Sequence, residues 1–163
     1  MAYLRQTVYL ETSFFSFYHD ERAEAAVVAM RQWSREWWEN QRHDFEILTS
    51  VAVLAELDQG KLPHRNRALE MALALPAIPL DESVEEIVGA YIRHKLMPND
   101  PVGDPLHLAL ASIHKCDYLL TWNCRHLANA RKFGHIRRVN ALLGLHIPIL
   151  TTPLELLDGD NES

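Results

Sequence analysis

Four oxygen-bearing side chains border the apolar runs of this chain, in positions where they could form one ligand site. Glu11 directly follows the first apolar run, and Asn123 ends a later one. Glu56 lies in the helical stretch after a second run, and Asp104 opens a helical stretch of its own. In open parallel sheets, ligands bind at the edge formed by the carboxyl ends of the strands. We therefore predict that the four side chains converge at that edge.

Each of these residues, taken alone, also has an ordinary structural interpretation. A glutamate such as Glu11 is favoured beside a helix N-terminus by the helix dipole. Asp104 and Asn123 both suit N-cap positions, and Glu56 suits an exposed helix face. The prediction of a shared site therefore depends on the elements that position these residues and on the motifs around them.

Short apolar runs alternate with helical patterns along the chain, which predicts βαβ units and a parallel sheet covered by helices on both faces. The predicted strands are residues 7–10, 45–50, 77–80, 117–123 and 147–150. Pro79 favours an edge position for the third strand. Helices are predicted after Thr12 or Ser13 as N-cap and at 22–42, 51–57, 63–75, 81–96, 104–115, 124–133 and 136–145, with a capped turn at 151–157.

Composition indicates an ordinary soluble domain. The chain has 163 residues, of which 48% are hydrophobic and 23% charged, so we expect a single domain over 1–157 and a disordered tail over 158–163. No signal peptide or membrane-spanning run is seen, which favours a cytoplasmic protein. Cys116 and Cys124 lack the spacing of a zinc or disulfide motif. The phosphate-binding motifs of nucleotide switch proteins are absent, so that class is disfavoured.

The charge of the chain is unevenly distributed. The net charge is −6, yet residues 101–150 hold six Lys and Arg against two acids. This asymmetry makes a local site for a polyanion possible, although basic residues also simply solvate helix faces. The bases that follow Asn123, which suit phosphate binding, are Arg125, Arg131, Lys132, Arg137 and Arg138.

Four motifs occur in an order that resembles the PIN domain, particularly toxins of VapC type, over residues 7–157. They are VYLETS, TSVAVLAEL, GDPLHLALAS and YLLTWNCRHLAN, and GDPLHLALAS followed by LLTWN is the most specific pair. The resemblance implies a three-layer α/β/α fold with a central parallel sheet. It further implies a metal-dependent ribonuclease, the toxin of a type II toxin–antitoxin pair, which forms a homodimer and is restrained by a small antitoxin protein.

The resemblance also assigns roles to the four oxygen-bearing residues. Glu11, Glu56 and Asp104 would be the acidic ligands of Mg²⁺ or Mn²⁺, and Asn123 would be a fourth catalytic position. Clustered carboxylates repel one another, so their placement is favourable chiefly with a hard dication between them. Such an ion acidifies a bound water and neutralises phosphate oxygens during in-line attack.

Two departures from the family pattern affect the expected activity. Glu11 stands where aspartate is common, and Asn123 offers an amide oxygen without a charge where many members have aspartate. The four positions therefore carry at most three negative charges, and we expect one firmly held metal ion. Loss of charge at Asn123 also leaves an alternative function open, that of an RNA- or protein-binding protein with weakened catalysis.

Residues next to these positions have two possible roles each. Ser13 and Thr121 are predicted to hydrogen-bond a ligand carboxylate, although both also suit caps or strand ends. His107 lies on the same helix face as Asp104, but magnesium sites seldom use imidazole, so packing is the favoured role. Asp100 is a reserve candidate for the site.

Overall fold

The computed structural model describes residues 4–97 and 103–157, and its centre is a five-stranded parallel sheet with the strand order β3-β2-β1-β4-β5. In chain order, β2 and β3 are added on one side of β1, and β4 and β5 are added on its other side. Adjacent β1 and β4 therefore form the switch point at which ligands bind in open parallel sheets. The strands are β1 (Gln6–Leu10), β2 (Phe45–Ser50), β3 (Ala77–Ile78), β4 (Tyr118–Leu120) and β5 (Ile149–Thr151).

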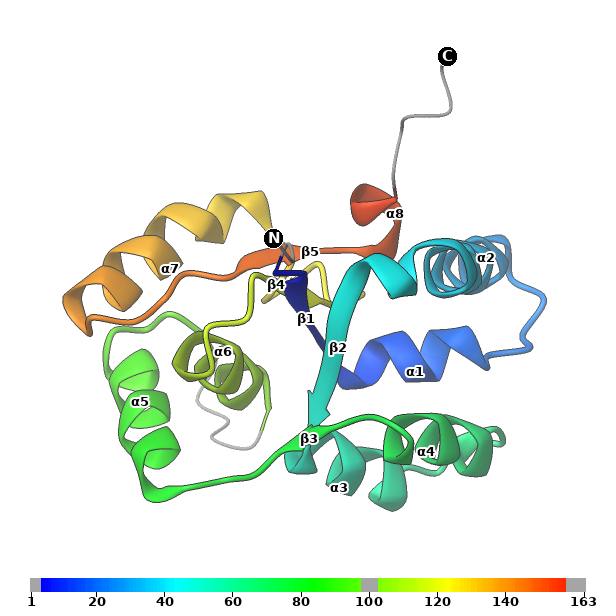
Figure 1. The fold of residues 1–163 in the computed structure, drawn as a ribbon, viewed down its shortest axis with the longest axis horizontal. Helices are drawn as coiled ribbons and strands as arrows, with labels where there is room; N and C mark the ends of the chain where they lie inside the picture. The colour runs from blue at the N-terminus through cyan, green and yellow to red at the C-terminus, as the bar shows by residue number, and fades with distance from the viewer. Residues whose placement is uncertain (1–3, 98–102, 158–163) are drawn as a thin grey trace, which may run out of the picture.

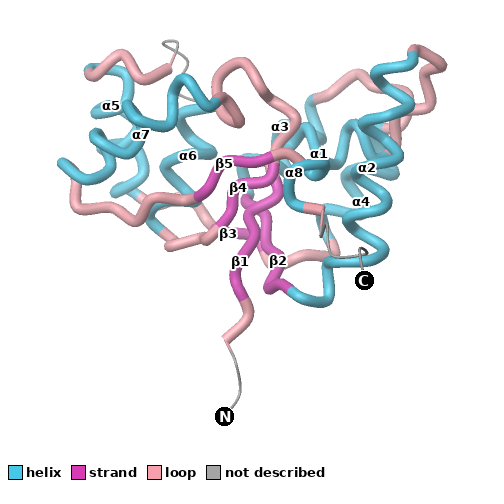
Figure 2. The backbone as a smooth tube through the Cα atoms, turned by 90° about the horizontal axis from the view of Figure 1, so that it is seen from above, coloured by secondary structure: helices cyan, strands magenta, loops and turns pink. Residues whose placement is uncertain are grey.

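Helices cover both faces of the sheet, which confirms the predicted three-layer α/β/α fold. One layer consists of α5 (Glu82–Arg93), α6 (Asp104–Ile113) and α7 (Ala130–Leu142), seen on the left of Figure 1 and of Figure 2. The other layer consists of α1 (Thr12–Tyr18), α2 (Ala25–Gln41), α3 (Val51–Gln59), α4 (Arg65–Leu73) and α8 (Pro153–Leu156), with a short 3₁₀ turn, η1 (Arg42–Asp44), before β2.

The central elements are apolar because both layers pack against them. Val8, Tyr9 and Leu10 of β1 are fully buried, as expected for a parallel strand with helices on both sides. Helix α6 is buried from Pro105 to Ser112, so it carries an almost continuous apolar sequence. Its polar residues within that span must therefore find partners inside the protein.

Capping residues fix where the helices begin. Ser50 caps α3 by accepting a hydrogen bond from the backbone N–H of Val53, as the sequence predicts. The prediction that Thr12 or Ser13 caps the first helix is wrong, because Glu11 itself is the N-cap of α1. A carboxylate can take this position because it accepts from a free N–H at the positive end of the helix.

Three predicted segments differ in the structure. Strand β4 ends at Leu120, because the N–H groups of Trp122 and Asn123 bond to side-chain hydroxyls in place of a neighbouring strand. Residues 124–128 form a turn and a bend and no helix, and the carbonyl of Asn123 accepts from both Leu127 and Ala128. The two predicted basic helices are one, because α7 continues through Gly134.

Two predictions fall on parts of the chain that the structure does not describe, namely Asp100 and the tail 158–163. Among the described helices, none has the length and apolar character needed to cross a membrane.

Candidate metal centre

Glu11 is held rigidly where β1 passes into α1. Its backbone N–H donates to the carbonyl of Leu120 on β4, and its side chain is only 6% exposed. The carboxylate oxygen Oε2 accepts hydrogen bonds from the Ser13 N–H (3.0 Å), the Ser13 hydroxyl and the Thr121 hydroxyl (2.7 Å). Three donors to one oxygen offset part of the cost of burying this polar side chain and fix its orientation.

Ser13 and Thr121 thus make the contacts that the sequence suggested for them, each with a hydroxyl on the Glu11 carboxylate. Ser13 Oγ also accepts from the N–H of Trp122, which ties the end of β4 to the start of α1. The indole of Trp122 packs against Trp33 and donates to Ser34, so it is part of the protein interior rather than a free stacking surface.

Glu56 reaches the same region from α3, and its carboxylate has partners on both oxygens. Oε2 accepts from the hydroxyl of Thr12 (2.6 Å), and Oε1 lies 2.7 Å from His107 Nε2. Burial alone would raise the pKa of Glu56, but the hydrogen bond and positive charge of His107, with the hydrogen bond from Thr12, lower it below its ordinary value. The side chain is 34% exposed, so solvent reaches the site on this side.

His107 lies on α6, with its ring 1% exposed between Glu56 and Tyr9. Its Nδ1 is 2.7 Å from the Tyr9 hydroxyl, which in turn is 2.7 Å from Ser50 Oγ. Burial would lower the pKa of His107, but the hydrogen bond to Glu56 and the charges of Glu11, Glu56 and Asp104 raise it above its ordinary value. The acids around the ring therefore generate a field that favours a cation.

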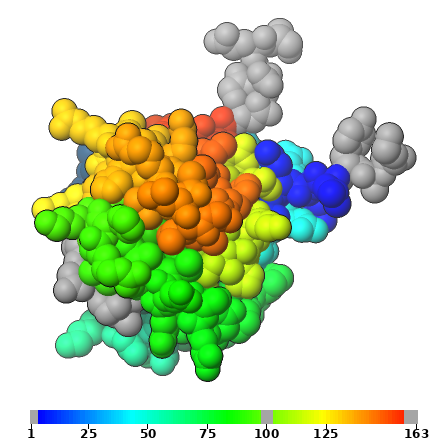
Figure 3. Space-filling view, turned by 90° about the vertical axis from the view of Figure 1, so that its left-hand side faces the viewer, coloured from blue at the N-terminus to red at the C-terminus, as the bar shows by residue number. Residues whose placement is uncertain are grey.

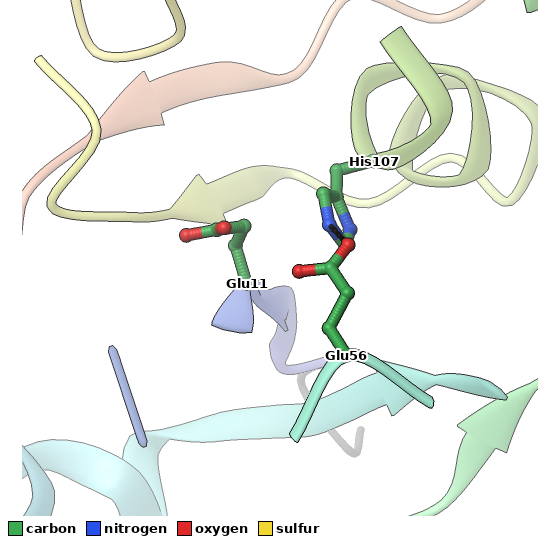
Figure 4. A group of neighbouring side chains, drawn as sticks. All are labelled: Glu11, Glu56 and His107. Carbon is green, nitrogen blue, oxygen red and sulfur yellow. Dashed lines mark hydrogen bonds and ion pairs between the residues drawn. The ribbon is translucent and has the colours of Figure 1, made fainter. Parts of the chain in front are cut away.

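Glu11, Glu56 and His107 bring one donor atom each to a common point. These atoms all lie within 4.8 Å of one another, and Figure 4 shows the Glu56 carboxylate and the His107 ring in contact with Glu11 beside them. Ligand atoms lie about 2.0–2.6 Å from a dication, so two ligands of one ion are at most about 5 Å apart. The observed spacing therefore fits a single ion with small side-chain adjustments.

Asp104 and Asn123 are bonded to each other beside this group. Asn123 Nδ2 donates to Asp104 Oδ1 at 2.8 Å, and Asn123 Oδ1 accepts from the N–H groups of Arg125 (3.2 Å) and His126 (3.0 Å). The amide orientation is chemically consistent, because its oxygen meets two donors and its nitrogen meets a carboxylate. The oxygen expected to face a metal ion thus caps the turn after β4.

Of the predicted acidic ligands, the structure brings Glu11 and Glu56 together, whereas Asp104 is outside the group of mutually close donor atoms. Asp104 is still near enough for its charge to contribute to the raised pKa of His107. His107, for which the sequence predicted a packing role, is the third member of the group. Its position three residues after Asp104, on the same helix face, was the signal that could have identified it.

The predicted RNA-binding residues lie on α7 and on the turn before it. Together α5 and α7 occupy much of the face shown in Figure 3. Arg125, Arg131, Arg137 and Arg138 are exposed, whereas Lys132 is half-buried with its Nζ 3.4 Å from the carbonyl of Leu96. Within the described residues, none of the five forms an ion pair with an acidic side chain, so none has an acidic partner that an anionic ligand would have to displace.

No protein-family model matches the chain, and no curated protein matches it. The fold and the site themselves define a parallel α/β protein in which the buried Glu11 and the partly exposed Glu56 lie close together at the switch point of its sheet.

Proposed function

We propose that this protein is a metal-dependent endoribonuclease with a PIN-like site, which hydrolyses phosphodiester bonds in RNA. The observation that supports this most directly is the meeting of Glu11 and Glu56 at the carboxyl edge of the sheet, beside the switch point between β1 and β4. Paired carboxylates at such an edge are suited to holding a hard dication.

Glu11 and Glu56 are the residues that would hold Mg²⁺ or Mn²⁺, with Asp104 as a third carboxylate beside them. The bound ion would supply acidity to an attacking water and neutralise charge on the phosphate. The protein fixes the Glu11 carboxylate through Ser13 and Thr121, and Thr12 orients Glu56. Asn123 orients Asp104 through the hydrogen bond to its carboxylate.

The basic residues of α7 and its preceding turn would bind RNA phosphates outside the site. Such contacts give affinity without base specificity. The motif resemblance supports a more specific proposal, that the protein is the toxin of a type II toxin–antitoxin pair, acts in the cytoplasm as a homodimer and is restrained by a small antitoxin protein. Co-purification with the product of a short neighbouring gene would test that part separately.

A second function is favoured by two contacts in the structure. His107 already provides a partner for Glu56, and the amide of Asn123 already provides one for Asp104. Two of the three acids are therefore stabilised without a metal ion, as expected of a protein that binds RNA or another protein on this scaffold and cleaves weakly or not at all.

Cleavage of single-stranded RNA by the purified protein distinguishes these functions. We expect cleavage with Mg²⁺ or Mn²⁺ and none in excess chelator, and we expect Glu11→Gln to abolish it because the buried charge is lost. Glu46→Gln is the matched control, since Glu46 is an exposed residue of β2. Undiminished cleavage in chelator would refute the metal mechanism, whereas absence of cleavage with every metal and RNA would favour the binding function.

A further inference from the structure

The donor group at the switch point contains a nitrogen atom as well as two carboxylates. A ring nitrogen of His107 shares the 4.8 Å group with one oxygen from Glu11 and one from Glu56 (Figure 4), and Nε2 is the nitrogen 2.7 Å from Glu56 Oε1. The ring is 1% exposed and Glu11 is 6% exposed, so both face the interior of the site. Within the described part of the chain, Glu11 Oε2 receives three hydrogen bonds, whereas Oε1 receives none.

We propose that His107 is a direct ligand of the cation, which makes this a centre of two carboxylates and one imidazole that prefers a first-row transition dication such as Mn²⁺ to Mg²⁺. The proposal rests on the proposed function for the presence of a cation. Carboxylates suit Mg²⁺ and Mn²⁺ alike, but imidazole is a ligand typical of transition metals and is seldom used by Mg²⁺. One nitrogen in the donor set therefore shifts selectivity away from Mg²⁺.

The surroundings of the ring have the arrangement found around ligating histidines. Such residues donate the N–H of their other ring nitrogen to a nearby acceptor, which fixes the ring and its tautomer. Here Nδ1 is 2.7 Å from the Tyr9 hydroxyl, and that hydroxyl is 2.7 Å from Ser50 Oγ. Without a cation, Nε2 donates its N–H to Glu56. With Nδ1 donating to Tyr9 and Tyr9 donating to Ser50, loss of the hydrogen on Nε2 would leave its lone pair directed at a cation between the two carboxylates.

The competing role for His107 is that of a fixed counter-ion for Glu56. A counter-ion would stay bonded to Glu56 and keep Nε2 protonated, so a bound cation would contact oxygen atoms only. As a ligand, His107 instead gives up the hydrogen on Nε2 to solvent, and the cation replaces it. The two roles therefore differ in whether nitrogen contacts the metal, which is directly measurable.

Pulsed electron paramagnetic resonance of the full chain with Mn²⁺ provides that measurement. We expect a ¹⁴N coupling in the parent protein and in the control His135→Gln, whose histidine lies on α7. The coupling should be lost in His107→Gln, together with at least about a 10-fold fall in Mn²⁺ affinity and a much smaller fall for Mg²⁺. Tyr9→Phe should keep the coupling but weaken Mn²⁺ binding, because the ring loses its orienting partner.

The possible outcomes have different consequences for the ligand role of His107 and for the proposed function. Mn²⁺ bound to the parent protein without a ¹⁴N coupling would overturn the assignment of His107 as a ligand, and this measurement does not require any variant to fold. Failure of the folded parent protein to bind Mn²⁺ would overturn this inference and the proposed function together. A ¹⁴N coupling in a protein that cleaves no RNA would support the ligand and contradict the proposed function.

Discussion

Replacing Asn123 with aspartate would set two carboxylates against each other at the edge of the site. Asn123 Nδ2 donates to Asp104 Oδ1 at 2.8 Å, while Asn123 Oδ1 accepts from two backbone N–H groups. In Asn123→Asp the bonds to the backbone can persist, because a carboxylate oxygen also accepts them. The donor that faced Asp104 is replaced by a second negative charge.

Charge repulsion and the loss of one hydrogen bond both lower the free energy of unfolding of Asn123→Asp. Two like charges about 4 Å apart repel by about 1 kcal/mol in water and by about 4 kcal/mol near a protein surface. Loss of the hydrogen bond adds about 1 kcal/mol. Asn123 and Asp104 are both half-buried, so we expect the free energy of unfolding to fall by about 2–3 kcal/mol at pH 7 in chelator.

A divalent cation should reverse much of this loss. The extra carboxylate favours a bound dication, so metal affinity should rise by about 10-fold, equivalent to about 1.4 kcal/mol. Metal should therefore raise the melting temperature of the variant more than that of the parent.

Urea denaturation with chelator and with Mn²⁺ measures both effects. Asn129→Asp is the matched control: Asn129 caps α7 and donates to the carbonyl of Arg125, with no carboxylate as its partner. We expect the control to lose only about the 1 kcal/mol of that hydrogen bond, with no recovery in Mn²⁺. If Asn123→Asp equals the parent in stability in chelator and in metal affinity, Asn123 acts only as the cap of its turn.

Two further predictions concern Asp104 and His19. Asp104→Asn should lower the rate of RNA cleavage by more than about 10-fold. The protein should stay folded, since an amide oxygen can still accept from Asn123. Unchanged turnover would show that Asp104 is not part of the site. Burial, with the positive charges of Arg67 and Arg35, lowers the pKa of His19 to about 4. Between pH 6.5 and 4 the unfolded chain therefore takes up a proton at His19 that the folded protein does not. The free energy of unfolding then falls as the pH falls. His19 is half-buried, so we expect the free energy of unfolding to fall by about 1–2 kcal/mol rather than the full ~3.4 kcal/mol. In urea denaturation at pH 7 and 4.5, His19→Phe should lose less stability than the parent protein. A loss equal to that of the parent would contradict this assignment.

The strands could be predicted from the sequence because burial on both faces demands continuous apolar runs. Val8, Tyr9 and Leu10 illustrate this in β1, and all five predicted strands occur in the sheet. The segment 124–128 could not be predicted in the same way. Its composition is compatible with a helix, but its N–H groups bond to Asn123, whose side-chain oxygen accepts from Arg125 and His126.

The site could be predicted only in part, for a related reason. Strand order and helix starts indicate which residues reach the carboxyl edge, and Glu11 and Glu56 meet there. The sequence does not reveal which neighbours compete for each carboxylate. Asn123 bonds to Asp104, and His107 bonds to Glu56, because of side-chain orientations that arise only in the packed protein.

The central claim is that Glu11 and Glu56 hold one divalent cation. Anomalous diffraction from a crystal soaked in Mn²⁺ would test it most directly, because the manganese signal locates the ion without reference to activity. We predict one strong peak within about 2.0–2.6 Å of a carboxylate oxygen from each glutamate, and no such peak in Glu11→Gln. A well-diffracting soaked crystal with no peak between the two carboxylates, or with peaks only at surface acids such as Glu46, would contradict the claim.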